Sequence, residues 1–157
     1  MKKERGRLNM RQDSRFNTIA MYIRLSNEDS DLKMEENKYE SNSITNQRAL
    51  IKAYIKNQRE FDGWKIIEKC DDGFSGVAFD SRLEFVELIE MAKSGEVNCI
   101  IVKDFSRFGR DYLEVGKYIE QIFPFLGVRF ISINDGYDSE KTNDAGLDIV
   151  FKLSLIH

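Results

Sequence analysis

With 157 residues, of which 41% are hydrophobic and 32% charged, the chain is long enough to bury the core of one globular domain. A net charge of −3 argues against a protein that binds nucleic acid over its whole surface, although a local basic site remains compatible with it. The lone histidine, His157, argues against a histidine-based triad, and the sequence has neither cysteine–histidine spacing for zinc nor an apolar run of the roughly 18 residues that span a bilayer.

The first part of the chain combines a basic arm with a buried strand. Residues 1–17 are rich in lysine and arginine and predict either a flexible arm that touches a polyanion or an inert frayed terminus. Residues 18–25 form a nearly continuous apolar run, which predicts a central strand of a parallel sheet. Ser26 falls where this strand should end. Residues 27–42 carry six acidic residues and predict a long loop that moves as a lid over an anionic site.

A helix and a second strand follow. We expect Ser43 to be the N-cap of a helix from Ile44 to about Gln58, because apolar residues recur there at helical spacing. Gln47 lies on the buried face of this helix, where a glutamine needs a hydrogen-bonding partner. Residues 64–70 predict the second strand.

The next segment joins a glycine-rich turn to an amphipathic helix. Ser75 lies between Gly73 and Gly76, in a turn whose backbone N–H groups can converge on an anion, although this signal is weak alone. Arg82 directly precedes the helix that ends at Gly95. Because the helix dipole disfavours a cation at this end, we expect Arg82 to face an anion.

Residues 99–102 predict a third buried strand, and Arg107 and Arg110 follow it around a Phe-Gly pair. The two side chains match the geometry of a phosphate, but they could also form surface ion pairs with Asp104, Asp111 or Glu114. A helix over residues 111–123 is expected to end at Pro124.

The last part predicts a fourth strand at residues 128–133, a polar loop at 134–144 and an apolar helix from 145 to 156. The whole alternation is that of an α/β protein with a mainly parallel four- to five-stranded sheet flanked by helices. Cys70 and Cys99 lie in the strand-like runs and predict buried free thiols in a reducing, cytoplasmic environment.

Parallel strands bring their carboxyl ends to one edge, so the serines, the turn and the arginines can converge there. A hydroxyl surrounded by arginines, without histidine or metal ligands, suits attack on a phosphodiester.

The combined motif resembles the catalytic domain of the serine site-specific recombinases, the resolvase/invertase family. The resemblance covers residues 18–157 and rests on a set of matching positions: Tyr22-x-Arg24-x-Ser26, Gln47, Ser75-Gly76, Arg82 and Arg107-x-x-Arg110. The sequence of residues 103–110 is most similar to that of the large serine recombinases that act as transposases of mobile elements.

The resemblance implies a mechanism and partners. Ser26 would attack double-stranded DNA and leave a 5′-phosphoserine and a free 3′-hydroxyl, without a cofactor or metal. The four arginines would hold the scissile phosphate, and Gln47 and Ser75 would position the site. The full-length protein would work as a dimer and as a tetramer in the synapse, away from membranes.

Ser106 departs from the family pattern, which usually has an aspartate there, and Asp104 is the candidate substitute. The family also has a long helix and a DNA-binding region after this domain, so we expect a fragment that holds the catalytic domain alone. The alternatives are a phosphate- or nucleotide-sensing module with a flavodoxin-like sheet and, less favoured because no base activates water, a phosphoesterase.

Overall fold

The computed structural model describes residues 17–25, 37–71, 82–109 and 111–141. The sheet has the strand order β2-β1-β3-β4-β5, and all neighbouring pairs are parallel except β4 and β5. The strands are β1 (Thr18–Arg24), β2 (Lys65–Asp71), β3 (Cys99–Val102), β4 (Arg129–Ser132) and β5 (Tyr137–Asp138). The mainly parallel sheet predicted from the alternating pattern is therefore confirmed.

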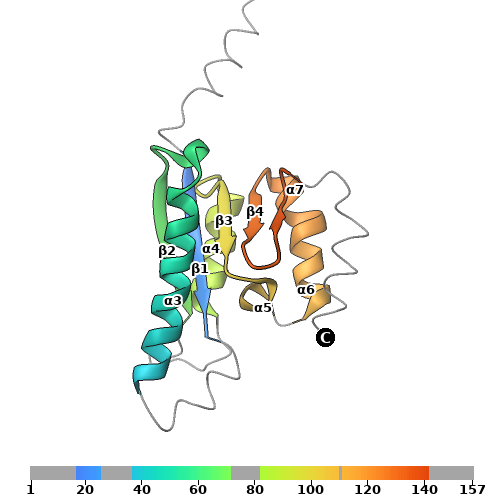
Figure 1. Cartoon of the computed structure of the whole chain (residues 1–157). Coiled ribbons are helices and arrows are strands. Elements are labelled where there is room, and N and C mark those ends of the chain that lie inside the picture. Colours follow the sequence, from blue (N-terminus) through green and yellow to red (C-terminus); the bar gives the residue numbers. More distant parts are fainter. Residues whose placement is uncertain (1–16, 26–36, 72–81, 110, 142–157) are drawn as a thin grey trace, which may run out of the picture.

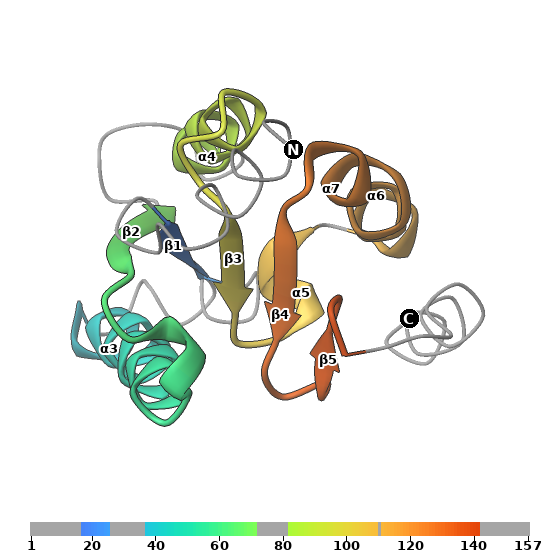
Figure 2. The same cartoon turned by 90° about the horizontal axis from the view of Figure 1, so that it is seen from above.

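Helices cover both faces of this sheet (Figures 1 and 2). One face carries α3 (Asn37–Lys56), and the other carries α4 (Leu83–Lys93) and the helix formed by α6 (Tyr112–Lys117), η4 (Tyr118–Ile122) and α7 (Phe123–Leu126). Two short elements complete the described chain: η3 (Arg59–Phe61) after α3, and α5 (Phe105–Phe108) directly after β3.

Strand β1 supplies both layers of the core, as its apolar run predicted. Ala20 and Tyr22 pack with α4 and the aromatic residues behind it, whereas Ile19, Met21 and Ile23 pack against α3. All five side chains are at most 2% exposed. Burial of each large apolar side chain stabilises the fold by about 1.5–3 kcal/mol, so β1 is held firmly in the centre of the sheet.

The helix after β1 is longer than predicted. It begins at Asn37, and Ser43 lies inside it, so the prediction of Ser43 as N-cap and of residues 37–42 as loop was wrong. Once a helix is nucleated, each further residue costs little, so the helix extends beyond the predicted cap. The remaining residues of the predicted loop, 27–36, lie outside the described residues, as do the basic arm at 1–16 and the apolar segment at 145–156.

Pro124 does not end the helix over residues 111–123, contrary to the prediction. A π-turn intervenes, in which the Phe123 N–H donates to Tyr118 O, and Pro124 then occupies the first turn of α7, where no N–H is needed. The helix ends at Gly127, whose φ of 71° is the left-handed conformation that closes helix C-termini.

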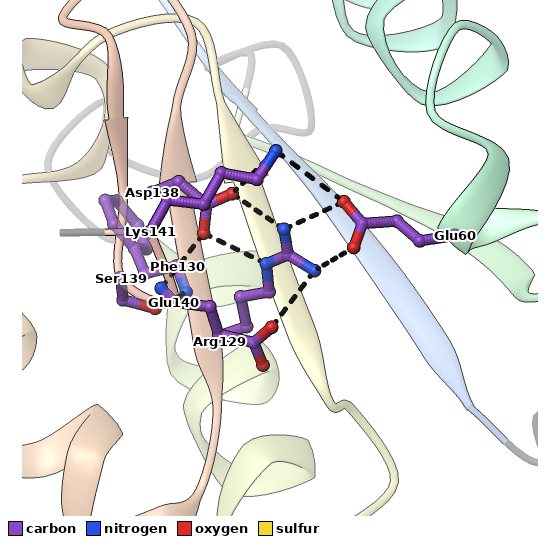
Figure 3. A network of polar contacts seen from close by, with 7 residues as sticks. All are labelled: Glu60, Arg129, Phe130, Asp138, Ser139, Glu140 and Lys141. Atoms are coloured by element: carbon purple, nitrogen blue, oxygen red, sulfur yellow. Dashed lines mark hydrogen bonds and ion pairs between the residues drawn. The ribbon is translucent and has the colours of Figure 1, made fainter.

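The predicted loop after β4 contains β5, which returns antiparallel along β4. Arg129 fixes the base of this hairpin in a cluster of charged residues, in which Arg129 and Asp138 are buried (Figure 3). Its guanidinium donates to Asp138 Oδ1 at 3.0 Å and Oδ2 at 2.7 Å, and to both carboxylate oxygens of Glu60 at 3.0 and 3.2 Å. Glu140 and Lys141 complete the cluster. It joins β4 and β5 to η3.

Both cysteines are free thiols; Cys99 is buried and Cys70 half-buried. Among the helices of the described ranges, none is long and apolar enough to cross a membrane.

Candidate active site

The arginines of interest gather at the carboxyl ends of β1 and β3. Arg24 is the last residue of β1, and two residues separate the end of β3 from the start of α5. Asp104 starts α5 as its N-cap, since its Oδ1 accepts from the Arg107 N–H at 3.1 Å. Phe105 and Phe108 anchor the helix in the core, which leaves Arg107 half-buried and Ser106 exposed between them.

The guanidinium groups of Arg24 and Arg107 each donate to the other residue's backbone carbonyl. Arg24 Nε donates to Arg107 O at 3.1 Å and its Nη2 to Ser106 O at 2.5 Å, while Arg107 Nη1 donates to Arg24 O at 3.2 Å. This reciprocal pairing holds two cations beside each other at the end of β1. Burial lowers the pKa of Arg24, and the neighbouring Arg82 and Arg107 lower it further. A site that concentrates positive charge in this way favours an anionic ligand.

Gln47 occupies the position that the sequence predicted. Its side chain is 1% exposed, and its Nε2 donates to Arg24 O at 3.1 Å, so the hydrogen-bonding reason expected for a buried glutamine is present. The amide oxygen is buried, and no donor reaches it within the described part of the chain. Gln47 therefore ties α3 to Arg24, the last residue of β1.

Arg82 is the N-cap of α4 and has a φ of 43°, which places a non-glycine residue in the left-handed region. Its residue exposure is 6%. Nη2 donates to Phe108 O, Nη1 pairs with Glu114 Oε1 at 3.0 Å, and the guanidinium carbon lies 3.8 Å from the centre of the Phe85 ring. The anion expected to face Arg82 is here the carboxylate of Glu114.

Tyr22 and Asp71 connect Arg82 to the sheet. The Tyr22 hydroxyl donates to Asp71 Oδ2 at 2.7 Å and accepts from Arg82 Nε at 3.5 Å. Burial raises the pKa of the Tyr22 hydroxyl, Arg82 opposes that rise and Asp71 adds to it. The phenol consequently stays protonated and acts as a fixed hydrogen-bond donor at neutral pH.

The structure thus brings Arg24, Gln47, Arg82 and Arg107 to one region, at the edge predicted for them. The other three candidates, Ser26, Ser75 and Arg110, lie outside the described residues. Of the alternative surface ion pairs, Asp104 binds the Arg107 backbone and the Ser106 hydroxyl, the latter at 2.5 Å, and Glu114 binds Arg82.

Sequence reasoning assigned no role to Asp71 and weighed Glu114 only as a surface ion-pair partner. A signal for Asp71 was its position at the end of a strand. The sequence 111–114 has the Asp-x-x-Glu spacing of a capping box, yet Glu114 turns its side chain to Arg82, 32 residues away, which no local pattern reveals.

Comparison with known proteins supplies the family. The sequence model described as "Resolvase, N terminal domain" matches residues 19–154, which is most of the chain. The chain belongs to the resolvase N-terminal domain family. This family comprises serine recombinases, enzymes that cleave and rejoin DNA, and the predicted resemblance is confirmed. No curated protein sequence matches the chain.

Solved structures agree with this assignment. A resolvase family site-specific recombinase from Streptococcus pneumoniae is 26% identical, with a TM-score of 0.66 over 89% of this chain and 87% of that one. The N-terminal catalytic domain of TP901-1 integrase is 24% identical, with a TM-score of 0.61 over 89% and 93%. The C-terminal catalytic domain of ISC1926 TnpA, an IS607-like serine recombinase, is 21% identical, with a TM-score of 0.50 over 88% and 79%. The last two support the fold alone.

Proposed function

We propose that this recombinase domain cleaves DNA by attack of Ser26 on a phosphodiester. The observation that carries the proposal is the gathering of Arg24, Arg82 and Arg107 at the carboxyl end of β1, two residues before Ser26 in the sequence. Arg82 has its counter-ion in Glu114, but it is costly to assemble the guanidinium groups of Arg24 and Arg107 side by side at the same strand end unless an anion uses them. In a family of DNA-cleaving enzymes, the scissile phosphate is that anion.

The proposed step exchanges one phosphate ester for another. Ser26 Oγ forms a bond to phosphorus and loses its proton, and the bond from phosphorus to the 3′-oxygen breaks, so that this oxygen leaves as a 3′-hydroxyl. A 5′-phosphoserine joins the protein to the DNA. Because the number of ester bonds is unchanged, the reverse attack by a 3′-hydroxyl rejoins the strands without ATP.

Arg24 and Arg107 would stabilise the transition state more than the bound substrate. Negative charge grows on the equatorial oxygens during the transfer, and guanidinium groups donate to two oxygens at once. Gln47 contributes by fixing the backbone at Arg24, and we assign Arg110 and Ser75 to the same phosphate by their sequence positions. We keep Asp104 as the candidate for the acid that protonates the leaving oxygen, by its sequence position two residues before Ser106.

The substrate is double-stranded DNA, and strand exchange requires a second copy of the recombinase. We place the protein in the cytoplasm, where it reaches DNA and where its free thiols persist. A sensing module is disfavoured, since it needs no activated hydroxyl next to the arginines.

The test compares Ser26→Ala with Ser30→Ala, a second serine four positions further along the same segment. Full-length recombinase is incubated with DNA, denatured, and the DNA that remains attached is sequenced, which identifies the crossover site. We expect the Ser26 variant to bind this site with unchanged affinity and to form no adduct, whereas the Ser30 variant forms it normally. A 5′-linked adduct formed by Ser26→Ala would refute the proposal.

A further inference from the structure

Arg82 already uses every nitrogen of its guanidinium group. Nε donates to the Tyr22 hydroxyl, Nη1 to Glu114 and Nη2 to Phe108 O. Its side chain is only 7% exposed, whereas an arginine that contacts DNA directly needs its guanidinium group at the surface. These contacts make Arg82, in this conformation, a brace within the site.

Asp71 builds the backbone from which Arg82 projects. The α4 helix spans 11 residues, and its N-cap, Arg82, makes no side-chain capping bond. Asp71, at the end of β2, supplies that bond from a distance: Oδ1 accepts from the Glu84 N–H at 3.0 Å and Oδ2 from the Phe85 N–H at 3.1 Å. The same carboxylate accepts from Tyr22. Asp71 therefore joins β1, β2 and the start of α4 beside the left-handed Arg82.

Glu114 holds Arg82 from the opposite side. It lies in the first turn of α6, where its N–H donates to Asp111 Oδ1 at 2.8 Å, so the backbone that carries it is fixed. Its carboxylate supplies the charge that balances the buried guanidinium, and an unbalanced buried cation is costly. Arg82 thus bridges α4 to α6.

Arg82, held in this way, contacts the carboxyl end of α5. A helix leaves its last carbonyl groups without partners inside the helix. Here guanidinium groups supply the partners for successive residues: Arg24 for Ser106 O and Arg107 O, and Arg82 for Phe108 O. The position of the α5 backbone, and with it that of Arg107, depends on where Arg82 lies.

We propose that Asp71 and Glu114 are positioning residues of the recombination site, which hold Arg82 from two sides so that it fixes the end of α5 and the arginine that α5 carries. This inference rests on the proposed function. Neither carboxylate touches the phosphate in this proposal; both act through Arg82.

The test uses replacements of nearly equal shape, Asp71→Asn and Glu114→Gln, in the full-length recombinase. Their controls are Asp62→Asn and Glu120→Gln, which remove a carboxylate from exposed positions of η3's C-cap and of η4. The probe is the duplex that the wild type attaches covalently. We measure the single-turnover rate of adduct formation at saturating protein, and the dissociation constant of the same duplex.

A positioning role predicts a rate lower by about 10-fold or more for both variants, because small displacements of a reacting group are costly, with a dissociation constant within about 2-fold of the wild type. The controls should react at the wild-type rate. In an Arg82→Lys background, Glu114→Gln should add less than about 2-fold, since its effect passes through Arg82.

If the wild type forms the adduct and both variants form it at the wild-type rate, the inference is overturned and the proposed function stands. A slower Glu114→Gln that lowers the rate as much in the Arg82→Lys background would overturn it too. Thermal unfolding is measured for each variant to confirm that it is folded. The Glu114 side chain is 30% exposed, so Glu114→Gln should stay folded, and it tests the inference alone if Asp71→Asn unfolds. A wild type that forms no adduct would overturn both the proposed function and the inference.

Discussion

Replacement of Arg129 by methionine should destabilise the domain far more than loss of its exposed partner Glu60. The side chain of Arg129 is 6% exposed and that of Asp138 is 8% exposed, whereas that of Glu60 is 44% exposed (Figure 3). Arg129→Met removes both hydrogen bonds to Asp138 and leaves its carboxylate in the protein interior, where the Glu140 N–H at 3.1 Å and the more distant Lys141 still contact it.

The magnitude follows from burial. Removal of one partner from a buried ion pair costs about 3–5 kcal/mol, and the contacts that remain around Asp138 place Arg129→Met near 3 kcal/mol. The Glu60 carboxylate is well solvated, so Glu60→Gln should cost at most about 1 kcal/mol. Equilibrium unfolding in urea near neutral pH measures both, with equal m-values as the check that the two variants unfold the same structure.

The same pair predicts a dependence on pH. Burial favours the neutral form of Asp138, but the Arg129 hydrogen bonds outweigh it and hold the pKa of Asp138 below its usual value; the Arg129 bonds also lower the pKa of Glu60. A lowered carboxyl pKa stabilises the fold above the usual value of about 4 and is lost as the pH falls below it. The difference between wild type and Arg129→Met should therefore shrink towards pH 3.

Two results would refute this reasoning. If Glu60→Gln costs as much as Arg129→Met, burial does not decide the strength of the cluster. If the cost of Arg129→Met is the same at about pH 3 and pH 7, the ionised form of Asp138 is not what the arginine stabilises.

Three further changes probe the site. Arg107→Lys keeps the charge but loses the fork that reaches Arg24 O, so adduct formation should slow by about 10²-fold, and a near-normal rate would show that charge alone suffices. Gln47→Leu removes both the donor to Arg24 O and a buried acceptor; its free energy of unfolding should change by less than about 1 kcal/mol while cleavage slows, and normal cleavage would deny Gln47 a role. Gly109 has an extended backbone, but a Cβ there would collide with Val115 Cγ2, so Gly109→Ala should cost about 1–3 kcal/mol in urea unfolding, and a neutral result would mean that α6 yields.

Much of the fold could be predicted because its signals are local. The apolar run of β1 indicated a strand buried on both faces, and helical spacing placed Gln47 on the inner face of α3. The carboxyl-edge rule for parallel strands then brought Arg24 and Arg107 together without any knowledge of distances.

The errors arose where one local rule was overridden by its neighbours. Ser43 has the chemistry of an N-cap, but helix propagation continued through it towards Asn37. Pro124 ends most helices, but a π-turn placed it where its missing N–H has no consequence. The strand β5 was missed because two residues carry too little pattern to distinguish them from a polar turn.

The contacts of Arg82 could be predicted only in part. Its position at a helix start indicated an anionic partner, but the identity of that partner depended on the packing of α4 against α6. Likewise, the capping of α4 by Asp71 joins residues separated by the segment 72–81, and no spacing rule connects them.

The most direct test of the central claim is to locate the bond between protein and DNA. The covalent adduct is digested with nuclease and then with trypsin, which cuts after Arg24 and Lys33 and releases residues 25–33. Fragment-ion mass spectrometry of this peptide should place a phosphoryl-linked nucleotide on Ser26 and leave Ser30 unmodified. A nucleotide on Ser30, Ser75 or Ser106, or on any other residue, would contradict the account.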